Sequence, residues 1–342
     1  MRKVRVLVLM HEELVPPESL EGLEEREVMQ IAMEYDVRHA LRELGHEVQV
    51  LGVKDELGPI RRTIQEWQPH VVFNLLMHFR GVGVYDAYVV SYLELLRVPY
   101  TGCNPRGLLL CNDKVLAKKI LGWHRIPTPR FALFPRGRPV KAPPRLGFPL
   151  FVKSAAEHSS LGIAQASIVY DEESLRDRVV FVHRTVGTDA IAEEYIEGRE
   201  LTISVMGNQR LQAFPIWELT FQNLPEGAAA IATSKLKWDV DYQARVGARS
   251  GPARRLPEGK AEEITRMAKR IYRALGLSGF ARIDLRLTPE GRIYVLEANP
   301  NPDLCHDEDF SQSAKTAGVD YDTLIQRLVN LGLRWAEGWQ GD

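Results

Sequence analysis

The chain has 342 residues, of which 45% are hydrophobic and 26% charged, and its formal net charge at pH 7 is −1. This composition is ordinary for a folded globular protein, and the length is enough for two or three domains. Because nucleic-acid binding needs a surplus of basic residues, the near-neutral charge argues against nucleic acid as a partner. The three cysteines lack metal-binding or disulfide spacing, and Arg5 interrupts the short apolar N-terminus, so we expect a cytoplasmic protein without a membrane segment.

The first third of the chain alternates predicted strands and helices. Apolar runs and helical spacing of apolar residues predict strands at 4–9, 48–51 and 71–75, and helices at 24–44, 60–67 and 85–96. Such alternation predicts a parallel sheet with covering helices, and therefore the α/β class. Ligands of such sheets collect at the carboxyl ends of the strands. We expect this first domain to span residues 1–107.

A second unit is expected over residues 108–198. It begins with a helix near Lys114, which Asn112 or Asp113 can cap. A proline-rich extended connection follows, and then a strand that ends in Lys153. The loop after that strand, residues 154–163, is rich in small and hydroxyl residues whose backbone N–H groups could bind an anion. A plain serine-rich hairpin loop is the alternative.

A third unit is expected over residues 199–342, which makes three domains in all. The same patterns predict two strands and two helices, at 201–206, 211–219, 258–275 and 321–338. Between them, residues 223–259 are predicted to form a basic, mobile loop that contains Lys235, Lys237 and Arg245.

The most informative stretch of the chain is a predicted β-hairpin within residues 279–304. Two alternating segments, 280–287 and 292–298, flank Thr-Pro-Glu-Gly, which has Pro and Gly where a type I turn favours them. Alternation divides the hairpin into a polar face and a core face. The polar face carries Arg282, Asp284, Glu297 and Asn299. The core face carries Ile283, Leu285, Leu287, Tyr294 and Leu296.

A turn that closes on this tetrad places Arg282 opposite Glu297, and Asp284 opposite Val295. Two carboxylates and an amide then converge beside a guanidinium. Hard oxygen ligands of this kind suit Mg²⁺, which completes its shell with water and phosphate, and the absence of His and Cys from the patch argues against zinc. The alternative is an antiparallel strand pair with a solvated charged face, which is common.

The order of polar residues along the chain resembles a known family. Lys114, Lys153, the Ser-Ser pair at 159–160 and residues 193–200 precede the hairpin. The most specific part is Arg-Ile-Asp at 282–284, followed by Leu-Glu-Ala-Asn ending at Asn299. Together these motifs resemble the ATP-grasp enzymes, most closely the D-alanine–D-alanine ligases, over essentially the whole chain. The resemblance implies a three-domain ATP-grasp architecture, in which two α+β domains clasp ATP behind an N-terminal parallel α/β domain.

The resemblance implies an ATP-dependent, ADP-forming carboxylate–amine ligase that acts through an acyl phosphate, with small amino acids or peptides as substrates. It assigns two Mg²⁺ ions, with Mn²⁺ as an alternative, to Asp284, Glu297 and Asn299. It assigns catalytic roles to Arg282, which faces the oxyanion, to Ser159 in the loop that closes over the phosphates, and to Glu25, which binds the ammonium of the first amino acid. It assigns ATP to Lys114, Lys153, Ser160, Glu193, Glu194, Ile196, Glu200 and Arg245.

Several of these residues have plainer alternatives. Glu25 lies among acids at a helix start, where the helix dipole favours them. Lys114 could be a surface lysine, and Lys235 or Lys237 could take the phosphate role of Arg245. Glu193 and Glu194 cannot both be buried without partners, so one is expected to face solvent.

The stretches that bind amino acids in that family depart from its pattern. The family's His-Gly-x-x-Gly-Glu-Asp-Gly corresponds to residues 78–86, where the Glu-Asp pair is missing, and its Ser-Pro-Gly corresponds to Asn-Pro-Asp at 301–303. An acid at this place should repel a substrate carboxylate. A ligase for other amino acids or a peptide, or a nucleotide-binding protein without ligase activity, therefore remain alternatives, and an ordinary kinase is disfavoured because the chain has no P-loop. A homodimer is a further expectation from the family.

Overall fold

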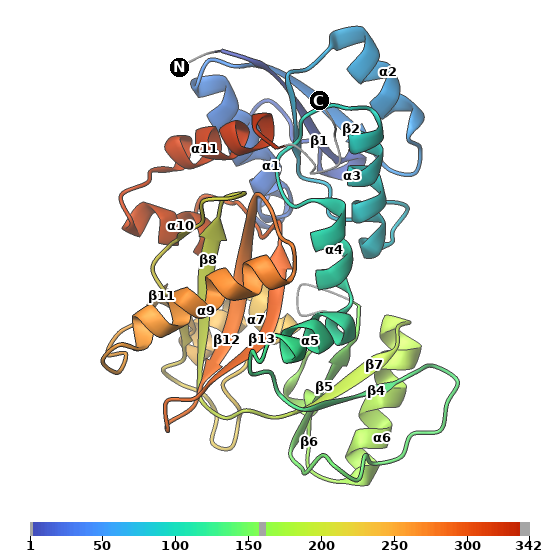
Figure 1. Ribbon diagram of the computed structural model, residues 1–342, viewed down its shortest axis with the longest axis vertical. Helices are drawn as coiled ribbons and strands as arrows, with labels where there is room; N and C mark the ends of the chain where they lie inside the picture. The colour runs from blue at the N-terminus through green and yellow to red at the C-terminus, as the bar shows by residue number, and fades with distance from the viewer. Residues whose placement is uncertain (1–2, 157–161, 336–342) are drawn as a thin grey trace.

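The computed structural model of the protein describes residues 3–156 and 162–335 (Figure 1). Within these ranges the strands form three sheets, each drawn from one stretch of the chain. The first sheet is parallel and the other two are antiparallel, with helices packed on them. The predicted α/β class is confirmed, whereas the domain boundaries at 107/108 and 198/199 stay predictions.

The N-terminal sheet has the strand order β2-β1-β3, and both of its strand pairs are parallel. Its strands are β1 (Arg5–His11), β2 (Glu47–Val53) and β3 (Val71–Asn74), and its helical segments are η1 (Glu12–Leu14), α1 (Glu25–Glu43), α2 (Gly58–Trp67), η2 (Gly83–Tyr85) and α3 (Asp86–Leu95). These bounds lie close to the predicted ones. The sequence signal is clear here because strands buried on both faces are continuous apolar runs, and β3 is buried throughout.

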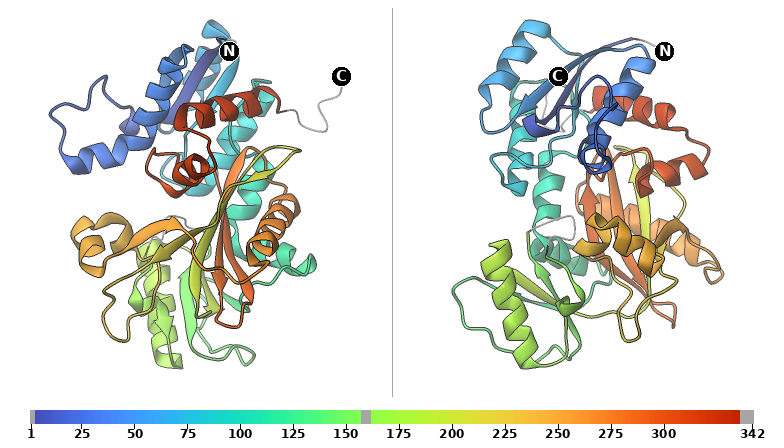
Figure 2. Two further views of the ribbon diagram at one scale, coloured as in Figure 1. Left: turned by 90° about the vertical axis from the view of Figure 1, so that its left-hand side faces the viewer. Right: turned by 180° about the vertical axis from the view of Figure 1, so that it is seen from behind.

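The end of the chain returns to this first sheet. Helices α10 (Asp309–Thr316) and α11 (Tyr321–Leu333) follow the last strand, and α11 packs on α1 and β3. One apolar core joins Val8 of β1 and Leu41 of α1 to Leu328 of α11. Figure 2 shows the red C-terminal helices beside the blue N-terminal elements. Residues of the third predicted unit thus help to enclose the first sheet.

The central sheet has the order β4-β7-β5-β6. Two helices lead into it, α4 (Pro105–Asn112) and α5 (Lys114–Trp123), and Asp113 caps α5 by accepting a hydrogen bond from the Leu116 N–H. The elements of this part are β4 (Phe131–Phe134), β5 (Leu150–Ser154), η3 (Gln165–Ser167), β6 (Ile168–Val169), α6 (Glu172–Phe181), a π-helix (Val182–Val186) and β7 (Ala190–Glu194). Of these, β4 and α6 were not predicted, because prolines flank β4 and polar residues dominate α6.

The C-terminal sheet has the order β11-β10-β8-β12-β13, with β9 paired to β8. Its elements are β8 (Arg199–Met206), β9 (Gln212–Ala213), β10 (Trp217–Thr220), α7 (Ser234–Trp238), α8 (Val240–Val246), β11 (Arg249–Pro252), α9 (Lys260–Ala274), β12 (Phe280–Leu287) and β13 (Ile293–Pro300). The prediction of a structureless loop over 223–259 was wrong. Thr233 and Asp239 cap two short helices there by accepting hydrogen bonds from backbone N–H groups three residues on.

The hairpin of β12 and β13 is confirmed, but its predicted register was wrong. Arg282 lies opposite Asn299, and Asp284 lies opposite Glu297. The turn is one residue longer than predicted, since Leu287 pairs with Ile293, and a bulge at Leu296 adds a second shift.

The bulge also reverses the alternation of β13. Ile293 and Val295 are buried on the core face, whereas Tyr294 and Leu296, which were predicted there, are only half-buried. Beyond the bulge, Glu297 and Asn299 point to the same side as Arg282 and Asp284. The predicted polar face is therefore confirmed, while the predicted core face of β13 is corrected.

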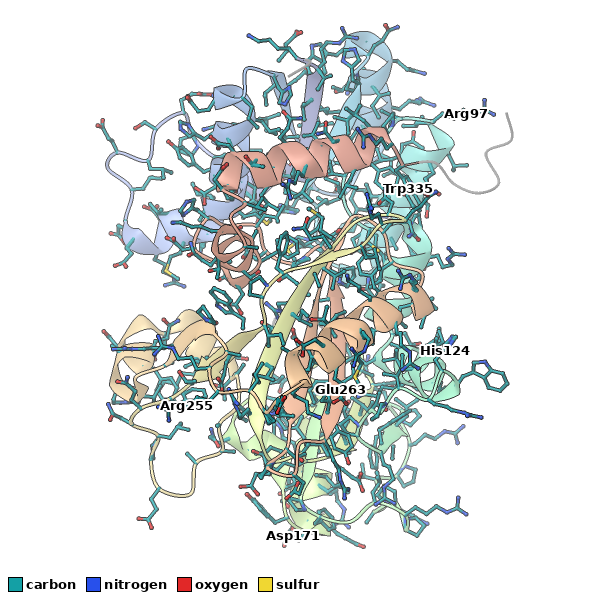
Figure 3. All side chains as sticks on the ribbon, turned by 60° about the vertical axis from the view of Figure 1, so that its left-hand side comes forward. Arg97, His124, Asp171, Arg255, Glu263 and Trp335 are labelled. Atoms are coloured by element: carbon teal, nitrogen blue, oxygen red, sulfur yellow. The ribbon has the colours of Figure 1, made fainter. Side chains whose placement is uncertain are left out.

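Some charged residues lie at the surface, as is usual in folded proteins. Arg97, Asp171 and Arg255 are exposed at the periphery (Figure 3). In the part of the chain that the structure describes, no helix is both long and apolar enough to cross a membrane.

Candidate active site

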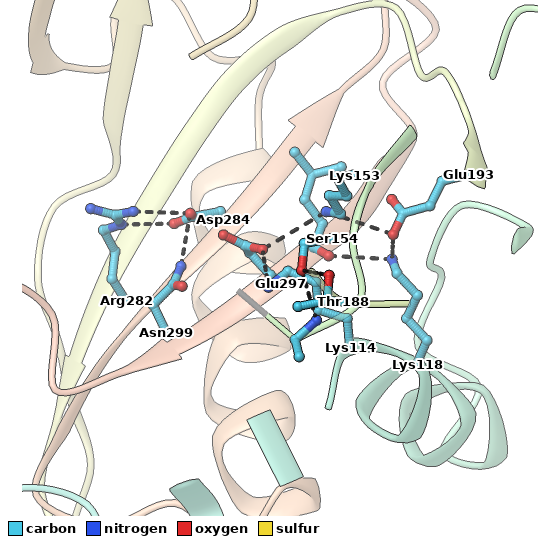
Figure 4. A network of polar contacts seen from close by, with 12 residues as sticks. Lys114, Lys118, Lys153, Ser154, Thr188, Glu193, Arg282, Asp284, Glu297 and Asn299 are labelled. Atoms are coloured by element: carbon cyan, nitrogen blue, oxygen red, sulfur yellow. Dashed lines mark hydrogen bonds and ion pairs between the residues drawn. The ribbon is translucent and has the colours of Figure 1, made fainter. Parts of the chain in front are cut away.

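The polar face of the hairpin is a connected hydrogen-bond network (Figure 4). Arg282 binds Asp284 with two parallel bonds, from Nε to Oδ1 at 2.8 Å and from Nη2 to Oδ2 at 3.0 Å. Asn299 donates from Nδ2 to the same Oδ2 at 2.9 Å. Such a bidentate pair fixes both side chains in orientation as well as in charge.

Burial and ion pairing shift the pKa values of Arg282 and Asp284 in opposite directions. Burial alone would lower the pKa of Arg282, but the adjacent carboxylate of Asp284 holds that pKa above its ordinary value. Burial raises the pKa of Asp284, although the guanidinium opposes the rise. Arg282 is therefore a permanent positive charge at the centre of the face.

Beside the hairpin lies a group of buried charges that we call the lysine cluster. It consists of Lys114, Lys118, Lys153, Glu193 and Glu297. Lys114 Nζ lies 3.6 Å and Lys153 Nζ 3.8 Å from Glu297 Oε2. Lys118 Nζ lies 3.2 Å and Lys153 Nζ 3.6 Å from Glu193 Oε1. The cluster thus joins helix α5, two strands of the central sheet and strand β13.

Local geometry explains why these side chains meet. Lys114 and Lys118 are four residues apart on α5, so they share one face of the helix. On the central sheet Glu193 lies directly opposite Phe151, and Lys153 is the diagonal neighbour on the same face. The polar face of the hairpin then supplies Glu297.

The cluster holds three ammonium groups against two carboxylates. All three lysine side chains are at most 8% exposed, and Glu193 is 3% exposed. Burial lowers the pKa of Lys114 and Lys118, and the two carboxylates raise the pKa of Lys153 in spite of its burial. Buried charges are stable only when they are paired, so this surplus of positive charge makes the cluster a place for an anionic ligand.

A second buried ion pair lies on strand β12, two residues beyond Asp284. Arg286 Nη2 donates to Glu200 Oε2 at 2.7 Å, and its guanidinium also donates to the carbonyls of Gly198 and Ala230 at 2.8 Å. Burial raises the pKa of Glu200, and Arg286 opposes the rise. If the strand alternation is continued from Arg282 and Asp284, Arg286 also falls on the polar face. Arg286 was nevertheless not predicted as a site residue.

The loop that follows β13, residues 301–309, is rich in acids, and we call it the acidic loop. Asp303 Oδ1 accepts a hydrogen bond from the Cys305 N–H at 2.8 Å, and Ser250 donates to Asp309. The charge of Asp309 contributes to the raised pKa of both Arg282 and Asp284, so this end of the loop lies near the hairpin site. The middle of the loop faces α1, where the His306 N–H donates to Asp36 at 2.9 Å.

Comparison with known proteins places this chain in a family. The family described as D-ala D-ala ligase C-terminus matches residues 124–330. A D-alanine–D-alanine ligase of Desulforudis audaxviator is 32% identical over 85% of this chain and 90% of its own length. An uncharacterized protein of Sinorhizobium fredii, y4sG, is 31% identical over 86% of this chain and 85% of its own length. The chain belongs to the D-alanine–D-alanine ligase family.

A solved structure supports the ATP-grasp fold of this family member. The D-alanine–D-alanine ligase from Bacillus anthracis, complexed with ATP, superposes with a TM-score of 0.74, at 23% identity, over 97% of this chain and 98% of its own. The resemblance inferred from the motifs is therefore confirmed for the family and the fold. The chain is an ATP-grasp ligase by descent.

The structure brings most of the predicted site residues of this ligase together, but not all. Lys114, Lys153, Glu193, Arg282, Asp284, Glu297 and Asn299 share the lysine cluster or the adjoining polar face. Glu194 is not part of the lysine cluster and pairs with Arg130. This agrees with the expectation that only one of the two glutamates is buried. Ile196 is half-buried just past the end of β7, on the way to Glu200.

Two other predicted residues lie apart from this group. Glu25 is the first residue of α1 and is exposed on the N-terminal part. Arg245 is exposed on α8, where its guanidinium and the Lys235 ammonium both lie over the ring of Tyr242. Ser159, Ser160 and the side chain of Lys237 lie outside the described residues.

Lys118 is the member of the cluster that sequence reasoning missed. The sequence did indicate a position beside Lys114, because Lys118 lies one turn after it on the same face of a predicted helix. A lysine on a helix is read as a surface residue by default, and only the tertiary structure shows that this face is buried.

The oxygen donors of the hairpin fit Mg²⁺. Within the described ranges, no three His, Cys or carboxylate side chains converge closely enough to hold a metal alone. Asp284, Glu297 and Asn299 nevertheless supply two carboxylates and one amide, and Mg²⁺ takes few protein ligands and completes its shell with water and phosphate. In this structure Arg282 and Asn299 bind the Asp284 oxygens, so an ion would replace part of these contacts.

Proposed function

We propose that this ligase uses Mg²⁺-ATP to join a carboxylate to an amine, with release of ADP and phosphate. The observation that carries the proposal is the contact between a buried cluster with surplus positive charge and a strand pair that presents two carboxylates, an amide and an arginine. The cluster suits a polyphosphate, and the hairpin suits the reacting phosphoryl and acyl groups.

On the nucleotide side, Lys114 and Lys153 bind the phosphates of ATP. Glu193 accepts a hydrogen bond from the adenine amino group. Its buried Oε1 makes no hydrogen bond of good geometry with the described residues, although two ammonium groups lie within ion-pair distance. The backbone at Glu194 and Ile196 completes the adenine contact, and Glu200 binds the ribose.

On the hairpin, Asp284, Glu297 and Asn299 hold two Mg²⁺ ions. When bound, these ions neutralise phosphate charge and orient the γ-phosphoryl group for transfer. The three side chains lie on neighbouring positions of two paired strands, which keeps their oxygens in fixed relation.

The reaction has two steps. A carboxylate oxygen of the first substrate attacks the γ-phosphorus, the bond to ADP breaks, and an acyl phosphate forms. The amine of the second substrate then attacks the acyl carbon, the C–O bond to phosphate breaks, and the amine loses a proton. Arg282 stabilises the oxyanion of the tetrahedral species, for which it must share its donors between Asp284 and the substrate. Glu25, Ser159, Ser160 and Arg245 keep the roles that the family suggests as predictions.

The amine substrate is an amino acid or a short peptide, and D-alanine is the first candidate because relatives carry the name D-alanine–D-alanine ligase. The acidic loop is the feature that favours a different substrate. It places Asp303 and Asp309 around the end of β13, where a free carboxylate on the incoming amine would be repelled.

The test is ADP release from Mg²⁺-ATP across a panel of D- and L-amino acids and dipeptides, with Glu297→Gln as control. Activity that peaks with D-alanine and is lost in the control supports the family's substrate. Activity only with another amino acid or a peptide supports the mechanism and replaces the substrate. Bound ATP with no ADP release from any member of the panel would contradict the proposal.

A further inference from the structure

Lys118 makes two contacts that reach different sheets. Its Nζ lies 3.2 Å from Glu193 Oε1 on β7, and it donates a hydrogen bond to the carbonyl of Leu296 on β13, also at 3.2 Å. The side chain is 3% exposed. Lys114 and Lys153 pair with Glu297. Lys118 instead donates its hydrogen bond to Leu296, the residue before Glu297.

Leu296 is the bulged residue of β13. Leu285 pairs with Val295 and Asp284 pairs with Glu297, so Leu296 is left without a partner on β12. Val295 directs its N–H to the carbonyl of Pro127. A bulge interrupts the ladder, and its polar groups need partners from outside the strand pair. Lys118 supplies one for the Leu296 carbonyl.

The bulge decides which way Glu297 points. Side chains two apart on a regular strand share a face, so without the extra residue Glu297 would lie on the core face with Val295. With the bulge, Glu297 moves to the polar face and lies opposite Asp284. The orientation of this metal-binding carboxylate therefore depends on the backbone conformation at Leu296.

We propose that Lys118 is a positioning residue that stabilises the Leu296 bulge and couples it to Glu193, so that the metal-binding and adenine-binding carboxylates are held at a fixed spacing. This inference rests on the proposed function, because it assigns those two roles to Glu297 and Glu193. Lys118 touches neither the reacting atoms nor the phosphates in this assignment.

A role in folding alone would not require a charged side chain at position 118. Lys118→Met removes only one of the two ammonium groups beside Glu193, because Lys153 Nζ remains 3.6 Å away, and a methionine of similar length would cover the same surface. What methionine cannot do is donate to the Leu296 carbonyl or neutralise Glu193. Its effect should therefore fall on ligand binding more than on folding.

The experiment compares Lys118→Met with Lys119→Met, its exposed neighbour on α5. ADP binding is measured by isothermal titration calorimetry, first in EDTA and then over a series of Mg²⁺ concentrations, and thermal unfolding is recorded for each variant. We expect Lys118→Met to need about 10- to 100-fold more Mg²⁺ for half-maximal enhancement of ADP binding, the range for residues that orient metal ligands. Lys119→Met should match the wild type.

Wild-type Mg²⁺ dependence in a folded Lys118→Met would overturn the inference. If Lys118→Met does not fold, Lys118→Gln, which keeps a hydrogen-bond donor without the charge, is tested in the same way, and failure of both to fold would show a structural role and also overturn it. Absence of Mg²⁺-dependent ADP binding in the wild type would instead count against the proposed function, so the two failures are distinguishable.

Discussion

The lysine cluster and the acidic loop meet the same hairpin, but they are built in opposite ways. In the cluster the three lysines and Glu193 are buried, Glu297 is half-buried, and every charge faces an opposite charge from another element. In the acidic loop Asp303 bonds to a backbone N–H two residues away, and Asp307 has 93% of its side chain exposed. Changing one member of the cluster removes a partner from a buried charge, whereas the exposed side chain of Asp307 in the loop can change with little effect on the core.

This difference matches what each region has to recognise. Under the proposed function the cluster binds a polyphosphate, whose charge and shape are the same for every ATP-dependent ligase. The loop lies where the amine substrate enters, and substrates differ among ligases. A mutually paired site beside a loop with partly exposed acids allows one chemistry to serve several substrates.

The sharpest way to test this contrast is to remove a charge from the cluster. Glu297→Gln deletes a carboxylate that we propose binds the metal, and leaves Lys114 and Lys153 with one carboxylate fewer. We expect ADP release to fall by about 1,000-fold, since the preorganised charge around the phosphoryl group is lost. A coupled ADP assay measures it, and Glu290→Gln, in the exposed turn of the same hairpin, should keep wild-type activity. Equal activity in the two variants would contradict the role of Glu297.

Removing Arg282, the arginine proposed to stabilise the oxyanion, should have the next largest effect. Arg282→Met is expected to lower kcat by about 100-fold, the usual consequence of losing one oxyanion donor, with a smaller change in the KM for ATP. Arg292→Met, an exposed arginine on the same hairpin, is the control. A variant that loses ATP affinity instead of kcat would place Arg282 in nucleotide binding.

A substitution in the acidic loop should change the choice of substrate without abolishing the reaction. Asp303→Asn removes a negative charge beside the end of β13. We expect the ratio of kcat/KM for amines with a free carboxylate over those with an amide to rise about tenfold, or 1.4 kcal/mol. Asp307→Asn, which lies in the same loop with an exposed side chain, should leave the ratio unchanged. An unchanged ratio in both variants would show that the loop does not contact the amine substrate.

The smallest expected effect concerns stability at the α1 side of this loop. Burial, with a smaller contribution from the charge of Asp303, raises the pKa of Glu34 to about 7. Because the folded pKa exceeds the ordinary value of 4.5, the unfolded chain loses this proton at lower pH than the folded protein, so Glu34 lowers stability progressively as the pH rises from 4.5 to about 7. Glu34→Gln should gain up to about 3 kcal/mol at pH 8 and nothing at pH 4. Denaturant unfolding at both pH values measures the gain, and an equal gain at both would refute this cause.

Sequence reasoning worked where one physical signal dominated. The parallel sheet was predicted because its strands are apolar runs between helices, and the polar face of the hairpin because alternation is strict on β12. Prediction from the sequence failed where contacts between distant elements, and not the local pattern of apolar and polar residues, determine the structure. At the bulge, the Leu296 carbonyl accepts a hydrogen bond from Lys118 and the Val295 N–H donates to Pro127, both far away in the chain, and the pattern of residues 292–298 does not predict the bulge.

The same limit applies to the site itself. The residues of the hairpin and the two lysines that end or begin elements were identified from motif order. The pairing of Arg286 with Glu200 and the burial of Lys118 require knowledge of which helix face meets which sheet. Contacts between elements distant in sequence cannot be read from periodicity, which describes only one element at a time.

The most direct test of the central claim follows oxygen atoms through the reaction. The carboxylate substrate that is most active in the panel is labelled with ¹⁸O in both carboxylate oxygens and incubated with Mg²⁺-ATP and the amine. An acyl-phosphate route requires one ¹⁸O in each phosphate released with ADP, because the C–O bond to phosphate breaks in the second step. Phosphate without the label, or release of AMP and pyrophosphate, would contradict the account.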